Sequence, residues 1–142
     1  MQTYDASNIF ARILRNELPS SRIFETADFV AIMDVMPQSK GHCLLIPKAP
    51  SRNLLDASDE VLSKALPEVA RLARAAKKAF SADGVTITQF NEAPAGQTVF
   101  HLHFHVIPRY AEEETVRHAD RMADPTVLAE QATAIRARLD PS

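Results

Sequence analysis

Histidine and apolar residues alternate strictly in one short segment of the chain. The alternation runs from His101 to Val106 and is followed by the apolar Ile107. Because successive side chains of an extended strand point to opposite faces, residues 101–107 are predicted to form a half-buried strand. Its polar face would carry His101, His103 and His105, and its apolar face Leu102, Phe104 and Val106.

Apolar patterns predict further strands. Residues 22–25 and 29–35 are separated by a polar turn and are expected to form a hairpin. Residues 42–47 form a third apolar run, and residues 85–91, rich in β-branched side chains, lead through a loop into the histidine segment. These last two segments are expected to be antiparallel neighbours.

Apolar residues recur at helical spacing elsewhere. Asn8 is predicted to cap a short helix that begins at Ile9 and ends before Pro19. Residues 58–80 are predicted to form the main helix, in which apolar side chains occupy one broad face. Pro67 lies within it, so either the helix bends there or its first turns are irregular.

A C-terminal helix is expected after Asp124, which suits a cap, and Pro125, which suits the first helical position. The predicted order is helix, three strands, long helix, two strands, helix. Consecutive strands with hairpin-like links indicate an α+β fold with a mostly antiparallel sheet. Residues 1–142 are interpreted as a single domain.

Composition narrows the classes of partner. The 142 residues carry a formal net charge of -2, so there is no basic excess to hold a nucleic-acid polymer. No apolar run is long enough to span a membrane, and the first residues lack the pattern of a signal segment. We therefore expect a soluble, cytoplasmic protein with no membrane partner. The single cysteine, Cys43, lies in an apolar run and is expected to pack as a small hydrophobic side chain.

Three interpretations of the histidine row are open at this level. The row is a solvated strand face without function, a zinc site, or the site of metal-free nucleotidyl or phosphoryl transfer with a histidine nucleophile. Histidine titrates near neutral pH, which favours the two chemical interpretations. The flanking residues have to discriminate between them.

The loop before the histidine segment has features of an anion-binding loop. Gly96, one of three glycines in the chain, permits positive φ or a close approach to a ligand. The backbone N–H groups of Gln97, Thr98 and Val99 are expected to face an anion. Asn91 adds a neutral donor, as do the side chains of Gln97 and Thr98. An ordinary hairpin loop is the alternative, and the adjacent histidines weaken it.

Taken with this loop, the histidine segment resembles the signature of the histidine triad (HIT) family of nucleotide hydrolases and transferases. The family pattern is complete at His101 to Ile107. Other segments are similar to the family in the same order: Asn8-Ile9-Phe10-Ala11-Arg12-Ile13, Ala31-Ile32-Met33-Asp34-Val35 followed by Pro37-Gln38, Gly41-His42-Cys43-Leu44-Leu45-Ile46-Pro47-Lys48, and Asn91 to Gln97. The resemblance implies a HIT core over about residues 8–109 and a C-terminal helical extension over about residues 110–142.

The resemblance further implies five antiparallel strands per subunit and a homodimer whose sheets join. It also implies roles for the histidines. His103 would attack the α-phosphorus and become nucleotidylated, His105 would contact the α-phosphate, and His101 would orient the nucleophile partly through its backbone carbonyl. His42 resembles the fourth, supporting histidine of the family.

Nucleotide-binding positions follow from the same resemblance. Asp34 resembles the carboxylate that accepts both ribose hydroxyls. The positions similar to the apolar slot for the base, each with a core role as the alternative, are Ile9, Phe10, Ile13, Ile32 and Val35. The positions similar to those near the phosphate and leaving group are Asn91, Gly96, Gln97, Thr98 and Val99.

Two departures limit the comparison. Asn8 and Ala11 stand where some bacterial members have a zinc-binding pair of cysteines, so neither a metal nor a cofactor is expected. The chain has no tryptophan and lacks the tryptophan-containing tail of the Hint proteins, so substrate choice by the tail is not carried over. His118 matches no family position and is expected at the surface.

The implied reaction is cleavage of a purine nucleoside 5′-monophosphate from its leaving group through a nucleotidyl-His103 intermediate. The implied substrates are phosphoramidates, aminoacyl adenylates or dinucleoside polyphosphates. A purine-nucleotide-binding regulatory module with little or no turnover is the alternative. A zinc protein that uses the triad as ligands is a third hypothesis.

Overall fold

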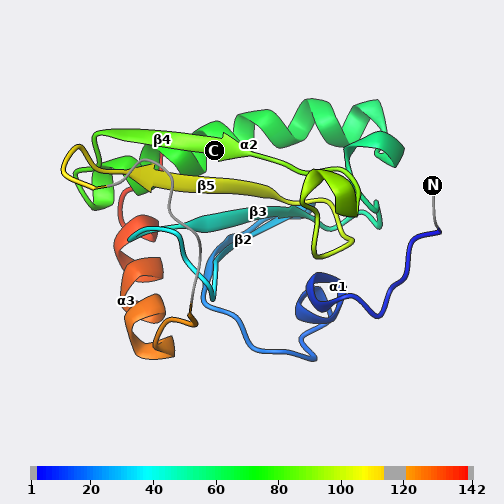
Figure 1. The fold of residues 1–142 in the computed structure, drawn as a ribbon, viewed down its shortest axis with the longest axis horizontal. Helices are drawn as coiled ribbons and strands as arrows, with labels where there is room; N and C mark the ends of the chain where they lie inside the picture. Colours follow the sequence, from blue (N-terminus) through cyan, green and yellow to red (C-terminus); the bar gives the residue numbers. More distant parts are fainter. Residues whose placement is uncertain (1–2, 114–120, 141–142) are drawn as a thin grey trace.

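An antiparallel sheet of five strands forms the centre of the part of the chain that the structure describes. The structure is a computed structural model and describes residues 3–113 and 121–140. The strands are β1 (Arg22–Glu25), β2 (Phe29–Met33), β3 (Cys43–Pro47), β4 (Gly84–Thr88) and β5 (Phe104–Arg109). Their order is β1-β2-β3-β5-β4, and each neighbouring pair is antiparallel (Figure 1). The predicted α+β class, the first hairpin and the pairing of the last two strands are confirmed.

Three α-helices accompany the sheet within these residues: α1 (Ile9–Leu14), α2 (Asp59–Ala79) and α3 (Pro125–Arg136). Each follows a residue whose side chain accepts a backbone N–H of the first turn, and these caps are Asn8, Ser58 and Asp124. α2 is continuous through Pro67, so its first turns are regular and only the missing N–H of the proline interrupts the bonding pattern. Two 3₁₀ turns, Leu54–Asp56 and Ala93–Ala95, lie in the loops before α2 and β5.

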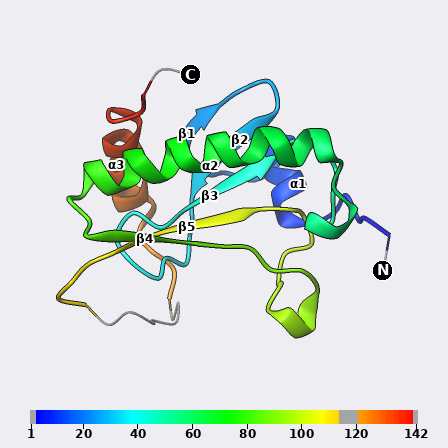
Figure 2. The same ribbon diagram turned by 90° about the horizontal axis from the view of Figure 1, so that it is seen from above.

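The two faces of the sheet carry separate apolar clusters. α2 and α3 contribute to the larger cluster, which includes Leu45, Leu72, Leu102, Val106 and Ile135. α1 contributes to the smaller cluster, which consists of Phe10, Ile13, Val30, Ile32, Leu44 and Ile46. Figure 1 shows α2 and α1 on opposite sides of the sheet, and Figure 2 shows α2 lying lengthwise over it. The apolar residues of the histidine segment belong to the larger cluster, so the predicted apolar face of that segment is confirmed.

The histidine strand is shorter than predicted. β5 begins at Phe104, so His101 and His103 precede it. The N–H of Leu102 donates to the carbonyl of Ser51, outside the sheet. Pro47, at the end of the neighbouring β3, has no N–H with which to continue the pairing. The prediction of a regular strand from residue 101 is therefore wrong at its first three positions.

Two other strands also end before their predicted limits. β2 ends at Met33 rather than at residue 35, because the carbonyl of Val35 accepts the N–H of Ala123 instead of a group in the sheet. β4 ends at Thr88 rather than at residue 91. Thr88 pairs with His105, and β5 begins at Phe104, only one residue before His105, so β4 has almost no partner strand beyond Thr88. Both boundaries are set by partners distant in sequence.

Cys43 is buried in the larger cluster, as predicted, and burial raises the pKa of its thiol far above the ordinary value. No helix in residues 3–113 and 121–140 combines the length and apolar character needed to cross a membrane. His118 lies outside the described residues.

α3 contributes directly to the core. Its inward residues Leu128, Ala132 and Ile135 are buried in the larger cluster. The guanidinium group of Arg136 donates to the carbonyls of Arg22 and Ile23 in β1. The C-terminal helix therefore closes the core beside the edge strand β1.

Replacing Ile135 by alanine is expected to lower the free energy of unfolding by about 2–5 kcal/mol, because it leaves a cavity in a fully buried site. Urea denaturation of the two proteins measures the difference. Val127→Ala is the matched control on the exposed side of the same helix and should change stability by less than about 0.5 kcal/mol. Equal effects of the two substitutions would contradict the docking of α3.

Candidate active site

Four of the five histidines lie together on the α1 side of the sheet. The ring centroids of His103 and His105 are 5.0 Å apart. Nε2 of His42 is 3.0 Å from Nδ1 of His105. Nδ1 of His103 is 2.7 Å from the carbonyl oxygen of His101. The structure thus brings the predicted triad and the predicted supporting histidine into one cluster.

The backbone N–H of Gln38 determines which ring nitrogen carries the proton in His42 and, through His42, in His105. The N–H of Gln38 donates to Nδ1 of His42 at 2.9 Å, so Nε2 of His42 carries the ring proton. That N–H points at Nδ1 of His105, which must accept it, and the proton of His105 is therefore on Nε2. Burial lowers the pKa of His42 to about 3 and also lowers the pKa of His105, so both rings are neutral at pH 7.

His103 is held as a neutral base with one free nitrogen. The carbonyl of His101 can only accept, so Nδ1 of His103 carries the proton and Nε2 keeps its lone pair. Burial lowers the pKa of His103 to about 4, partly offset by this hydrogen bond. The edge of Phe10 in α1 packs against the ring, with centroids 4.7 Å apart. This is the state that a nitrogen nucleophile requires.

His101 is fixed at both ring nitrogens. Nε2 lies 2.7 Å from the carbonyl oxygen of Pro47, to which it must donate. Nδ1 lies 2.7 Å from the hydroxyl of Tyr4. The ring is 1% exposed, so its side chain has no direct access to a substrate and its part in the site is carried by its backbone carbonyl.

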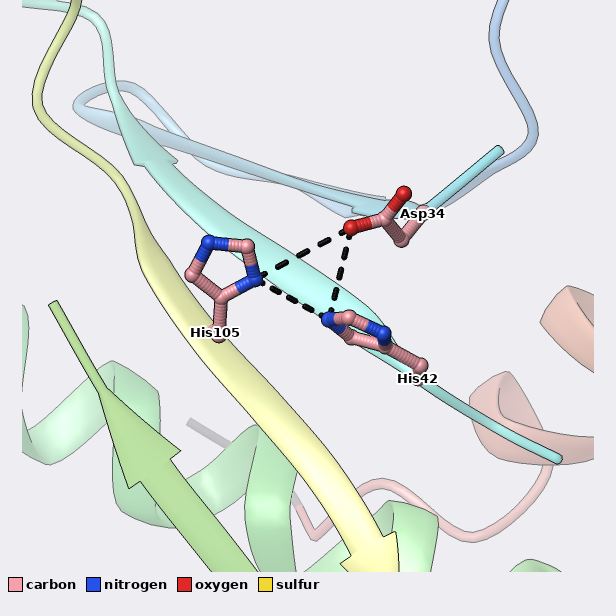
Figure 3. A group of neighbouring side chains, drawn as sticks. All are labelled: Asp34, His42 and His105. Carbon is pink, nitrogen blue, oxygen red and sulfur yellow. Dashed lines mark hydrogen bonds and ion pairs between the residues drawn. The ribbon is translucent and has the colours of Figure 1, made fainter. Parts of the chain in front are cut away.

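Asp34 forms a group of three potential metal ligands with His42 and His105 (Figure 3). Its Oδ2 lies 3.3 Å from Nε2 of His42 and 3.8 Å from Nδ1 of His105. Ligands of one tetrahedral zinc ion are about 3.4 Å apart, so the spacing alone suits zinc. The hydrogen bonding does not suit zinc, because Nε2 of His42 carries a proton and has no lone pair for an ion.

The carboxyl group of Asp34 has an unusual environment. Burial raises its pKa to about 6, against the opposing effect of the N–H of Met36, which donates to Oδ1 at 2.8 Å. Because His42 is neutral at pH 7, the contact between the two side chains is not an ion pair. Asp34 therefore changes charge close to neutral pH.

The loop before the histidine segment is held by Gln97, which is buried. Its side-chain oxygen accepts the N–H of Glu92 and the amide of Asn53, and its amide donates to the carbonyls of Arg52 and Val99. Both ends of this amide are thus engaged within the protein. In the described part of the chain, the backbone N–H groups of Thr98 and Val99 have no protein partner. The N–H of Gln97 was predicted to face an anion but instead donates to the carbonyl of Glu92 at 3.2 Å. Of the three predicted N–H groups, those of Thr98 and Val99 are left to meet an anion.

The positions predicted for the base slot fall into two groups. Phe10, Ile13 and Ile32 are buried in the smaller apolar cluster, against which Val99 also packs. Ile9 and Val35 are exposed. Asn91 lies at the start of the loop, where its side-chain oxygen accepts the N–H of Leu54. Ile9 lies in α1, which contributes to the buried cluster, so four of the five predicted positions lie on the α1 side of the sheet.

Several residues that contribute to the site were not predicted. Tyr4, the N–H of Gln38 and the carbonyl of Pro47 each bind a histidine ring. The ring of Phe90 lies 5.7 Å from that of His105. A bidentate ion pair between Arg52 and Glu92, with N–O distances of 2.8 and 2.9 Å, holds the loop. Backbone partners leave no signal in a sequence pattern, but a charged side chain in the loop that contains Gly96, such as Glu92, is a signal that can be read from the sequence.

The sheet and the histidine cluster define a small α+β protein with a buried, neutral histidine whose Nε2 lone pair is free. A sequence profile of the HIT domain matches residues 15–112. The chain therefore belongs to the HIT family.

Individual relatives agree with this assignment. Adenosine 5′-monophosphoramidase HNT1 of Saccharomyces cerevisiae is 40% identical over 111 residues, which cover 78% of this chain and 68% of the relative. The crystal structure of a HIT-like protein of Bartonella henselae involved in cell-cycle regulation has a TM-score of 0.90 and 51% identity, covering 96% of this chain and 100% of that one. A zinc-bound histidine triad family protein of Mycobacterium smegmatis has a TM-score of 0.79 and 34% identity, covering 93% and 92% of the two chains.

The raised pKa of Asp34 is open to direct measurement by carbon-13 NMR of the carboxyl groups during a pH titration. We expect a midpoint near pH 6 for Asp34, because burial disfavours its charged form. Asp5 is the internal control, since hydrogen bonds from Ser7 lower the pKa of its exposed carboxyl group. A midpoint for Asp34 at or below that of Asp5 would contradict the environment described here.

Proposed function

We propose that this protein is a nucleotide hydrolase that releases a purine nucleoside 5′-monophosphate through a covalent intermediate on His103. The observation that carries the proposal is the hydrogen bond of 2.7 Å from Nδ1 of His103 to the carbonyl of His101. It directs the Nε2 lone pair away from the backbone, and the low pKa keeps that lone pair available at neutral pH.

The reaction proceeds in two displacements. Nε2 of His103 attacks the α-phosphorus, a P–N bond forms, and the bond from phosphorus to the leaving group breaks. Water then attacks the same phosphorus, the P–N bond breaks, and His103 is returned to its neutral form. The Nε2–H of His105 donates to an oxygen of the α-phosphate in both steps, and His42 keeps His105 in the tautomer that can do so.

Nucleotide binding involves groups on both sides of the triad. The carboxylate of Asp34 accepts the two ribose hydroxyls once it is ionised, above about pH 6. The apolar side chains near α1 contact the base. The free N–H groups of Thr98 and Val99 bind phosphate oxygens beside Gly96.

A phosphoramidate is the substrate class that the relatives favour, because a yeast relative is named as an adenosine 5′-monophosphoramidase. Aminoacyl adenylates and dinucleoside polyphosphates are the other classes. An amine must gain a proton as it leaves, whereas a polyphosphate need not, so the two classes should differ in pH dependence.

The protein is also proposed to act as a homodimer in which the sheets of two subunits join at β4. β4 is an edge strand, since β5 is its neighbour in the described sheet. An unpaired edge offers a row of backbone donors and acceptors to a second strand. Ile87 in this strand and the nearby Phe90 are exposed apolar residues that such a contact would cover.

Incubation with adenosine 5′-phosphoramidate should give AMP, with and without a chelator, and rapid quenching should reveal an adenylyl adduct by intact mass. His103→Ala should remove both the adduct and the turnover, because no other ring nitrogen of the cluster has a free lone pair. His118→Ala is the control among the histidines. AMP binding without adduct or turnover in the unaltered protein would favour the nucleotide-binding module, and full turnover in His103→Ala would refute the mechanism.

Ile87→Asp is expected to convert the dimer to a monomer, because it places a charge in β4, the edge that the proposed contact would bury. Sedimentation equilibrium at micromolar concentration measures the mass. Val127→Asp, an exposed change on α3 beside the opposite edge of the sheet, should leave the dimer intact. A monomeric unaltered protein, or a dimer that survives Ile87→Asp, would refute this interface.

A further inference from the structure

We propose that Tyr4 is a positioning residue, whose hydroxyl donates to Nδ1 of His101 and so fixes the carbonyl that orients the nucleophile His103. The contact is short, with 2.7 Å between the two atoms. The two rings also meet edge to face, with centroids 5.6 Å apart and an angle of 66°. The inference rests on the proposed role of His103 and adds a residue that acts through His101.

Counting protons assigns the direction of this hydrogen bond. The carbonyl of Pro47 can only accept, so Nε2 of His101 carries the ring proton and Nδ1 must accept. The hydroxyl of Tyr4 is therefore the donor. Burial raises the pKa of Tyr4, so its hydroxyl stays protonated throughout the neutral range and the donor is always present.

The same residue, His101, carries the contact to the nucleophile. Its ring is bound at both nitrogens, and its carbonyl accepts Nδ1–H of His103 at 2.7 Å. Residues 101–103 precede β5, so no ladder of sheet hydrogen bonds holds this peptide group in place. The ring of His101 is therefore the anchor for the carbonyl, and the neighbouring N–H of Leu102, bound to Ser51, holds the other side.

The residues that follow Tyr4 are tied to the start and the end of α1. Asn8 caps that helix by accepting the N–H of Ala11, and its amide donates to the carbonyl of Asp5. Arg15 in the next turn donates to the carbonyl of Ala6. Phe10 of the same helix packs on His103, so one short helix is linked both to the segment that carries Tyr4 and to the aromatic wall of the nucleophile.

Without the hydroxyl, Nδ1 of His101 becomes a buried acceptor with no donor. A buried unsatisfied nitrogen is costly, and the ring can relieve the cost by rotating or by taking up a proton. Either change disturbs the anchor of the carbonyl, and the lone pair of His103 is then less well aimed. Among the described residues the hydrogen bond of the Tyr4 hydroxyl goes to His101 and not to Asp34 or the loop at Gly96, so binding of the nucleotide should change little.

Tyr4→Phe removes the hydroxyl and keeps the ring. We expect kcat for adenosine 5′-phosphoramidate to fall about three- to tenfold, as loss of one oriented hydrogen bond would produce, with KM changed by less than about twofold. Tyr110→Phe is the matched control, because Tyr110 is the other tyrosine of the chain and its hydroxyl donates to the carbonyl of Lys40 rather than to a histidine ring. An unchanged kcat in Tyr4→Phe, or an equal loss in the control, would overturn the proposal.

Nitrogen-15 NMR of labelled histidines provides a readout that does not depend on activity. In the unaltered protein we expect His101 with its proton on Nε2 and an unprotonated Nδ1 that accepts a hydrogen bond, and Tyr4→Phe should shift Nδ1 of His101 while Tyr110→Phe should not. A proton on Nδ1 of His101 in the unaltered protein would overturn the proposal, even if Tyr4→Phe did not fold. Absence of turnover in the unaltered protein would refute the proposed function but leave this hydrogen bond to be judged by its NMR signal.

Discussion

Three buried imidazole rings of the cluster are each hydrogen-bonded to a backbone group that can act only as a donor or only as an acceptor. The carbonyl of Pro47 must accept from His101, the carbonyl of His101 must accept from His103, and the N–H of Gln38 must donate to His42. In a dry site a misplaced proton leaves a buried polar atom without a partner, so these backbone groups select one tautomer for each ring. The free lone pair on His103 is the consequence, and so is the free N–H on His105.

This arrangement depends on an interruption of the sheet. In a regular strand the carbonyl of His101 would be used in pairing with a neighbouring strand. The pairing of β3 with β5 ends at Leu45 and Phe104, and Leu102 donates to Ser51, so the carbonyl of His101 is left for the ring of His103. A strand that continued to residue 101 would make the sheet more regular and would leave the ring of His103 without this hydrogen-bond partner.

The C-terminal helix reaches the same site through the loop that follows β2. Ala123 donates to the carbonyl of Val35, and the side chain of Gln131 accepts the N–H of Gly41 at 3.2 Å. Gly41 has a φ of +91°, and a Cβ there would lie 2.7 Å from the ring of Phe80. The loop between these two anchors carries the N–H of Gln38 that sets the proton of His42. The C-terminal extension therefore contacts both the apolar core and the loop whose Gln38 N–H sets the tautomer of His42.

The amino-acid sequence by itself determined the class of fold, the helix caps at Asn8 and Asp124, the apolar face of residues 102–106 and the family, because each depends on local periodicity, side-chain type or motif order. The tertiary structure alone decided where the strands end, which nitrogen of each histidine carries a proton, and that Gln97 is engaged within its loop while Tyr4 reaches His101. These features depend on partners such as Ser51 and Pro47, fifty or more positions from the triad. Their backbone groups are common to all residues, so they leave no pattern in the sequence, and only folding brings them within hydrogen-bond distance.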